Sequence, residues 1–157
     1  MLSYADTNKA MKPLKVTLIS HSDKVGGAAI VTFRLMQALR KAGVDARMIT
    51  FVKSSEDENI VEACHRNKRS ALFLAERGYI FLQNGFSKKD LFKVSIANTG
   101  RHLDKHPWVA DADVIALNWI NQGMLSLEGI DRLSALGKPI IWTMHDMWCL
   151  TGICHHA

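Results

Sequence analysis

Runs rich in apolar residues alternate along the chain with longer segments whose apolar residues recur every three or four positions. The runs contain no Gly and have the length of strands, whereas the periodic segments have the length and spacing of helices. Strands are predicted at 15–21, 46–52, 114–119 and 139–143, with a further one at 92–97. Helices are predicted between them at 28–42, 62–82 and 126–136. This alternation predicts an α/β fold with a Rossmann-like parallel sheet and helices on both faces.

The segment at 28–42 illustrates how periodicity assigns a buried face. Its apolar positions step by three residues, at Ile30, Phe33, Met36 and Leu39. We expect this side of the helix to pack on the sheet, and Gly43 to end the helix. The helix and its flanking strands form a βαβ unit. A loop containing Gly26 and Gly27 joins the first strand to the helix.

The last predicted strand, 139–143, carries no charged residue and is rich in Ile and Trp. We therefore expect it to be buried on both faces, as central strands of parallel sheets are. No linker or internal repeat divides the chain. Residues 1–157 are accordingly interpreted as a single domain.

The segment at 62–82 combines basic and apolar residues. Its basic cluster is Arg66, Lys68 and Arg69, and its apolar blocks are 71–74 and 79–82. Such a composition can dock a helix onto an anionic membrane surface. The apolar residues are too many for one interfacial stripe, however, so we expect most of them to be buried in the core. A peripheral contact with a membrane stays open as the alternative.

Composition narrows the class of protein. The 157 residues are 48% hydrophobic and 22% charged, which suits a packed core and argues against wholesale disorder. Three Cys do not make a disulfide framework and favour a reducing compartment. The amino-terminal segment lacks the apolar core of a signal peptide, and no apolar run reaches the roughly 20 residues of a spanning helix. These features predict a cytoplasmic protein. A net charge of +5 is too mild to require nucleic acid, which is not expected as a partner.

The loop Gly26-Gly27-Ala28 is a candidate binding element. Two adjacent Gly at the entry to a helix let backbone amides approach a ligand closely, and the helix dipole then favours a phosphate. The spacing fits neither the dinucleotide fingerprint nor a Walker loop. A plain tight turn between strand and helix explains the two Gly equally well.

Two polar pairs follow predicted strands, His145-Asp146 after 139–143 and Asn118-Trp119 at the end of 114–119. Open α/β sheets bind ligands at the carboxyl ends of their strands. A His, an amide and an indole together offer hydrogen bonds and an apolar platform, which suit a sugar. We expect these pairs to meet Gly26 and Gly27 on one rim. Ordinary hydrogen bonding at a strand end is the alternative.

The carboxyl-terminal segment contains four residues that are potential zinc ligands, namely Cys149, Cys154, His155 and His156. A structural zinc site needs a second, correctly spaced pair of ligands, and the chain contains none. We therefore predict that these residues are unligated, with completion of a site by residues downstream of Ala157 as the alternative, and we predict neither a metal nor a cofactor.

Three segments, at 19–48, 111–127 and 139–157, resemble the amino-terminal half of retaining GT-B glycosyltransferases of the family 4 type, notably those of bacterial surface-polysaccharide clusters. The most specific of the matching pieces is the run Trp-Thr-Met-His-Asp-Met-Trp at 142–148. The segments cover most of the chain and occur in the family's order. Relatives often have His in place of Asn118 and Pro in place of Cys149.

The resemblance implies an enzyme with its active site between two domains. The amino-terminal domain would receive a saccharide or lipid-linked acceptor, and a carboxyl-terminal domain, absent from this chain, would hold a nucleotide-diphosphate sugar. The sugar would be transferred with retention and without an obligatory metal. On this basis Gly26, Gly27 and Ala28 lie near the donor phosphates, Asn118 and Trp119 bind substrate, and the catalytic candidates are His145 and Asp146.

The isolated fragment is then expected to fold but to be inactive, and the whole enzyme to work in the cytoplasm, with the inner membrane face as an alternative location. Two other functions remain open from the residues themselves. One is a self-contained nucleotide- or phosphate-binding α/β protein, and the other is a non-catalytic interaction domain.

Overall fold

The computed structural model describes residues 12–155, and its centre is a parallel sheet of five strands. The strands are β1 (Lys15–Ser22), β2 (Asp45–Val52), β3 (Ile60–Glu62), β4 (Val114–Leu117) and β5 (Ile140–Trp142). They lie in the order β3-β2-β1-β4-β5, and every neighbouring pair is parallel. The predicted α/β fold with a Rossmann-like parallel sheet is therefore confirmed.

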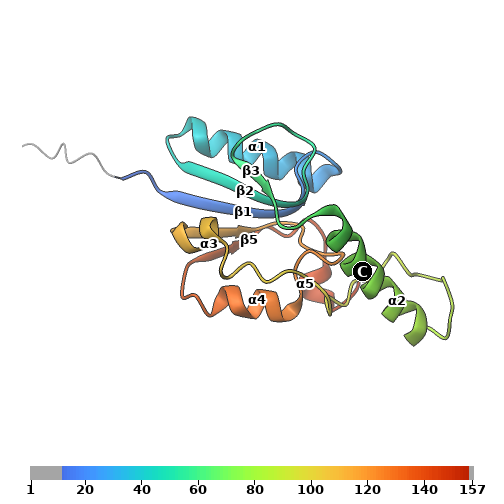
Figure 1. Ribbon diagram of the computed structural model, residues 1–157. Helices are drawn as coiled ribbons and strands as arrows, with labels where there is room; N and C mark the ends of the chain where they lie inside the picture. The colour runs from blue at the N-terminus through green and yellow to red at the C-terminus, as the bar shows by residue number, and fades with distance from the viewer. Residues whose placement is uncertain (1–11, 156–157) are drawn as a thin grey trace, which may run out of the picture.

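Within residues 12–155, five helices accompany the sheet (Figure 1). They are α1 (Gly27–Lys41), α2 (Arg66–Gln83), α3 (Pro107–Asp111), α4 (Leu127–Ser134) and α5 (Trp148–Thr151). Met36 of α1 packs on one face of the sheet, while Val109 of α3 and Leu133 of α4 pack on the other. The helix α2 instead extends away from the sheet. Among the described residues, no helix is long and apolar enough to cross a membrane.

The buried face of α1 differs from the predicted one. Ala29, Thr32 and Met36 are buried, whereas Ile30 is 43% exposed. The α-helix has 3.6 residues per turn, so positions that step by exactly three drift around the axis. Steps of three and then four keep the buried residues on one side. Of the predicted positions, Phe33, Met36 and Leu39 pack against the core as expected, and the prediction was wrong only for Ile30.

The strand β5 lies at the edge of the sheet, next to β4 alone. Ile140 and Trp142 pack against the core, but Ile141 is 59% exposed. The prediction that 139–143 is buried on both faces was therefore wrong. An uncharged apolar run does not distinguish a central strand from an edge strand with one apolar residue facing outward.

Four further elements differ from the prediction. The strand β3 and the short helices α3 and α5 were not predicted. The segment at 92–97 is not a strand, and its only β pairing is an isolated antiparallel bridge between Val94 and Cys154. The cap of α4 agrees with the prediction, because the Ser126 hydroxyl accepts a hydrogen bond from the Gly129 amide at 3.0 Å.

The helix α2 contradicts the expectation that most of its apolar residues are buried. Its buried residues are Glu76, Arg77 and Ile80, while Leu74 and Leu82 are 63% and 57% exposed. The charged pair faces inward because it satisfies the irregular backbone of the following segment. Glu76 Oε1 accepts hydrogen bonds from the amides of residues 96 and 97 at 2.9 and 3.0 Å. Irregular backbone that is buried needs such partners.

Candidate functional site

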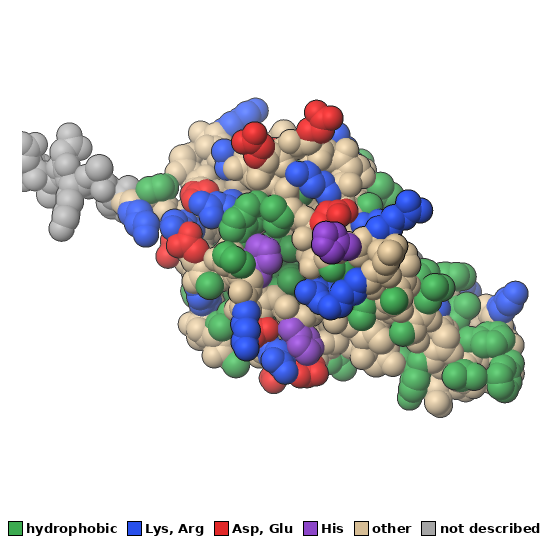
Figure 2. Space-filling model, viewed as in Figure 1, with side chains coloured by type: hydrophobic (Ala, Val, Ile, Leu, Met, Phe, Trp, Pro, Cys, Tyr) green, Lys and Arg blue, Asp and Glu red, His purple; other side chains and the backbone are tan. Residues whose placement is uncertain are grey.

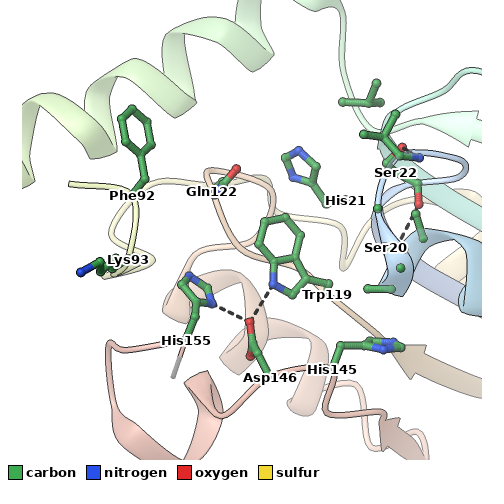
Figure 3. A pocket seen from close by; sticks show the side chains of 16 residues that line it. Ser20, His21, Ser22, Phe92, Lys93, Trp119, Gln122, His145, Asp146 and His155 are labelled. Carbon is green, nitrogen blue, oxygen red and sulfur yellow. Dashed lines mark hydrogen bonds and ion pairs between the residues drawn. The ribbon is translucent and has the colours of Figure 1, made fainter. Parts of the chain in front are cut away.

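A pocket of about 850 Å³ opens at the carboxyl edge of the sheet, and Figure 3 shows its walls. Parallel α/β sheets bind their ligands at this edge, so the pocket is the candidate site. The pocket is lined by most of the residues that were predicted for the site, namely Gly26, Gly27, Ala28, Trp119, His145 and Asp146. Asn118 lies behind His145, to which it is hydrogen-bonded. The structure thus brings the predicted residues together on one rim, and their roles stay predictions.

The amino terminus of α1 forms one wall of the pocket. Gly26 precedes the helix with φ 91° and ψ 162°, a conformation that is essentially restricted to Gly. Gly27 has no such constraint, and a Cβ added there would meet no atom within 4 Å. No described side chain caps the helix, and its first turn contains no acidic residue. These amides can therefore donate to an anionic group in the pocket.

The turn before α1 is held by the side chains of Ser22, which lines the pocket, and Asp23, which does not. The Ser22 hydroxyl accepts hydrogen bonds from the amides of Lys24 and Val25 at 3.3 and 3.1 Å. The Asp23 carboxylate accepts two more, from the Ser54 and Ser55 amides at 2.8 Å each. Burial alone would raise the pKa of Asp23, but these hydrogen bonds lower it overall. Asp23 thus ties this turn to the segment after β2.

His145 is placed to accept a hydrogen bond from a ligand. Its Nε2 lies 3.2 Å from Asn118 Oδ1, and because a carbonyl oxygen only accepts, Nε2 carries the proton. Asn118 is fixed in turn by a hydrogen bond from its Nδ2 to the Ala116 carbonyl at 3.3 Å. Burial lowers the pKa of His145, although the nearby Asp146 charge opposes the shift. A neutral His145 then presents Nδ1 as an acceptor, which suits a hydroxyl group.

Asp146 holds three segments of the rim together. Its Oδ2 accepts hydrogen bonds from Trp119 Nε1 at 2.8 Å and from His155 Nδ1 at 2.5 Å, as drawn in Figure 3. Its Oδ1 accepts from the Trp148 amide at 3.1 Å. Burial alone would raise the pKa of this carboxyl, but the hydrogen bonds from His155, Trp148 and Trp119 together hold it below its usual range. With both oxygens occupied, Asp146 orients its neighbours.

His155 also lines the pocket and continues this network into the interior of the protein. Its Nε2 lies 3.0 Å from the Ser95 hydroxyl, so Asp146, His155 and Ser95 form a chain in the order of a nucleophilic triad. Ser95 is fully buried, however, and its carbonyl accepts a 2.6 Å hydrogen bond from Trp148 Nε1. No substrate can reach a hydroxyl enclosed in this way. The chain therefore connects the rim to the segment that carries Ser95.

The potential zinc ligands do not form a metal centre in the part of the chain that the structure describes. Cys149 and Cys154 are free thiols, and no group of three or more His, Cys, Asp or Glu side chains between residues 12 and 155 could hold a metal ion. His156 lies outside the described residues. His155 instead belongs to the network of Asp146.

His21 lines the pocket but was not identified as a candidate from the sequence. Its Nδ1 donates to the Asn121 carbonyl at 3.2 Å, and its ring lies edge-on to Trp119 at 5.1 Å. Burial lowers the pKa of His21 to about 4, against the raising effect of that hydrogen bond. His21 is therefore neutral near pH 7, with Nε2 as an acceptor. The available signal was its position as a polar residue at the carboxyl end of β1.

The wall opposite α1 comes from the segment that was predicted to be a strand. Phe92 and Lys93 lie there, on the far side of Trp119 from the helix (Figure 3). Lys93 is exposed and forms an ion pair with Asp90 at 2.8 Å. Gln122 completes this side with a positive φ of 59°, which places it in a tight turn. Sequence reasoning missed Phe92 and Lys93 because their alternating pattern predicted a strand at 92–97, where the structure has irregular backbone.

Comparison with known proteins gives no match: no family model, no curated protein and no solved structure matches the chain. The fold and the pocket therefore define the class. The chain is an α/β protein with a Rossmann-like parallel sheet of five strands, and three histidines line the pocket at the carboxyl edge of that sheet.

Proposed function

We propose that the chain is the acceptor-side domain of a retaining GT-B glycosyltransferase of bacterial polysaccharide biosynthesis. The complete enzyme transfers a sugar from a nucleotide-diphosphate sugar to a saccharide or lipid-linked acceptor. A second, carboxyl-terminal domain holds most of the nucleotide. The observation that carries this proposal is the pocket itself, which combines the uncapped amino terminus of α1 with neutral His145 and the indole of Trp119.

Each part of the pocket suits one part of a nucleotide-diphosphate sugar. The α1 amides and the Lys93 ammonium favour the negative charge that develops on the departing diphosphate. Nδ1 of His145 and Nε2 of His21 accept hydrogen bonds from hydroxyl groups. The face of Trp119 provides an apolar platform for a sugar ring.

Catalysis on this proposal rests on electrostatic stabilisation of the leaving group and on positioning of the sugar. Asp146 is the only carboxylate among the described residues that line the pocket, and its oxygens already accept three hydrogen bonds. We therefore assign His145 the contact with the transferred sugar. Asp146 becomes a residue that positions Trp119 and His155 rather than a nucleophile or a base.

The test compares residues 1–157 with a longer chain that includes the proposed second domain. Titration calorimetry should give a dissociation constant of about millimolar for UDP and GDP sugars on residues 1–157, because one wall of the cleft is missing. The longer chain should transfer sugar to an acceptor. In that longer chain, His145→Ala should lower turnover far more than it lowers thermal stability.

The principal alternative is a self-contained phosphate- or nucleotide-binding protein, which the uncapped α1 terminus also favours. The same titrations decide between the two. Micromolar binding of a nucleotide by residues 1–157, or sugar transfer by them alone, would show that the half-enzyme proposal is wrong.

A further inference from the structure

From residue 71 to residue 82 the exposed face of α2 is apolar. The exposed residues in this range recur at three- and four-residue steps and carry no charge: Ala71, Leu74, Ala75, Gly78, Tyr79 and Leu82. Three of them are large and well exposed, with Leu74 at 63%, Tyr79 at 48% and Leu82 at 57%. A surface helix normally shows solvent its polar face. The polarity of α2 is therefore inverted.

The inverted orientation is fixed by contacts on the inner side of the helix. Glu76 and Arg77 are buried and form an ion pair at 3.0 Å. Arg77 also donates to the Val94 carbonyl at 2.9 Å, and Glu76 accepts from two backbone amides of the same segment. Rotating the helix to bury its apolar face would expose the backbone groups that these charges satisfy and would leave them unpaired.

The apolar face continues past the end of α2 and is surrounded by positive charge. Phe86, in the turn after the helix, is 68% exposed. Lys88 and Lys89 follow it, and both are exposed. Figure 2 shows apolar side chains gathering over this far end of α2, next to Lys or Arg side chains. We call the exposed apolar residues of α2 together with Phe86, Lys88 and Lys89 the α2 tip.

The excess charge of the chain is concentrated in this region. Between residues 66 and 93 there are seven Lys and Arg and two Asp and Glu, while the whole chain has 20 and 15. Both acids are already paired, Glu76 with Arg77 and Asp90 with Lys93. The remaining 13 basic residues outside the region balance 13 acidic ones. Residues 66–93 thus carry a net charge of +5, equal to that of the whole chain, although Arg69 is also paired with Glu62 outside this range at 3.1 Å.

We infer that the α2 tip docks this protein onto the surface of an anionic lipid bilayer. Leu74, Tyr79, Leu82 and Phe86 would enter the boundary between headgroups and acyl chains, and the flanking basic residues would contact anionic headgroups. This inference does not depend on the proposed function.

A second copy of the chain fits this face less well than a bilayer does. Parallel pairing of two α2 helices would bring Arg66 and Lys68 of each copy together. Antiparallel pairing would bring those residues next to Lys88 and Lys89 of the partner copy. No exposed acid lies on α2 to compensate, so both arrangements place like charges together. An anionic surface instead pairs every one of these charges.

Sedimentation with lipid vesicles tests the inference on the 157-residue chain. The chain should bind vesicles containing anionic phosphatidylglycerol and should not bind vesicles of phosphatidylcholine alone. Raising the salt to about 1 M should weaken the binding, because surface charges are then screened within about 3 Å. Leu82→Ser and Phe86→Ser should each weaken partitioning about tenfold, as expected for the loss of one buried apolar side chain. Charge reversal by Lys88→Glu with Lys89→Glu should abolish it.

The matched control is Leu127→Ser on α4, where the side chain is equally exposed at 60% but lies in another part of the molecule. This variant should bind vesicles as the unmodified chain does. His145→Ala should also leave vesicle binding unchanged, which separates this inference from the proposed function. Equal binding by all variants, or no binding to anionic vesicles, would overturn the inference. So would a dimer in light scattering that Leu82→Ser converts to monomer, because a second copy would then cover this face.

Discussion

At the scale of single residues, Gly26 and Gly27 show that two adjacent Gly can be required for different reasons. Gly26 is required for its backbone conformation, since φ 91° and ψ 162° are almost inaccessible to other residues. Gly27 is the first helical residue, and the space around its Cα is open toward the pocket. The sequence presents both as one Gly-Gly loop, and only the backbone angles separate them.

This difference predicts opposite results for two similar substitutions. Gly26→Ala should lower the free energy of unfolding by about 1–3 kcal/mol, because the new side chain strains the backbone. Gly27→Ala should leave it equal or slightly raised, since Ala is the better helix former. Gly27→Ala should nevertheless weaken ligand binding, because its methyl group projects into the pocket. Urea denaturation and calorimetric titration of both variants measure these effects. Equal destabilisation by both would contradict the assignment.

At the scale of secondary structure elements, four of the five strands of the sheet were predictable, whereas the short strand β3 and the buried face of α2 were not. The strands β1 and β2 agree with the predicted 15–21 and 46–52 almost to the residue. Both are long and lie in the core, so their apolar pattern reflects their surroundings directly. The face of α2 and the irregular segment at 92–97 could not be predicted separately, because each supplies the hydrogen-bond partners of the other.

The candidate site was likewise predictable only in part. His145, Asp146 and Trp119 follow predicted strands, and the rule for carboxyl ends of strands located them. Lys93 was not assigned to the site because its segment was predicted as a strand, and His155 was considered only as a potential zinc ligand. Their positions depend on Ser95 and Arg77, which are distant in sequence and become neighbours only on folding.

The helix α2 permits a direct test of its inverted polarity. Arg77→Met should lower the free energy of unfolding by about 3–5 kcal/mol, because it leaves the Glu76 carboxylate buried without its partner. Leu74→Ser, on the opposite side of the same helix, should change stability by no more than about 0.5 kcal/mol. Urea denaturation of the two variants provides the measurement. A larger loss from Leu74→Ser than from Arg77→Met would mean that α2 buries its apolar face.

At the scale of the whole molecule, one connected set of contacts links the pocket to α2. Asp146 binds Trp119 and His155, His155 contacts Ser95, and Ser95 lies in the segment that Arg77 of α2 holds. The pocket wall formed by Phe92 and Lys93 belongs to this same segment. A ligand in the pocket and a surface bound at α2 would therefore contact two ends of one polar network.

Asp146→Asn tests this network at its centre. The amide nitrogen that replaces one oxygen cannot accept a hydrogen bond, so a donor from Trp119, His155 or the Trp148 amide loses its acceptor. We expect a loss of about 1–3 kcal/mol in the free energy of unfolding at pH 7. Faster amide hydrogen exchange should accompany it in the terminal segment 147–155 and in 92–97.

The pH dependence of the stability lost in Asp146→Asn shows whether the Asp146 carboxyl acts in its charged form. The pKa of Asp146 is lower in the folded protein than in the unfolded chain, so its ionised form contributes stability above the ordinary Asp pKa of 3.8. That contribution disappears as the pH falls through the folded pKa, which lies below 3.8. The difference in stability between the unmodified protein and Asp146→Asn should therefore be constant from pH 7 to about pH 5 and shrink in stronger acid. A difference that persists unchanged at pH 3 would show that the charge of Asp146 does not hold the rim together.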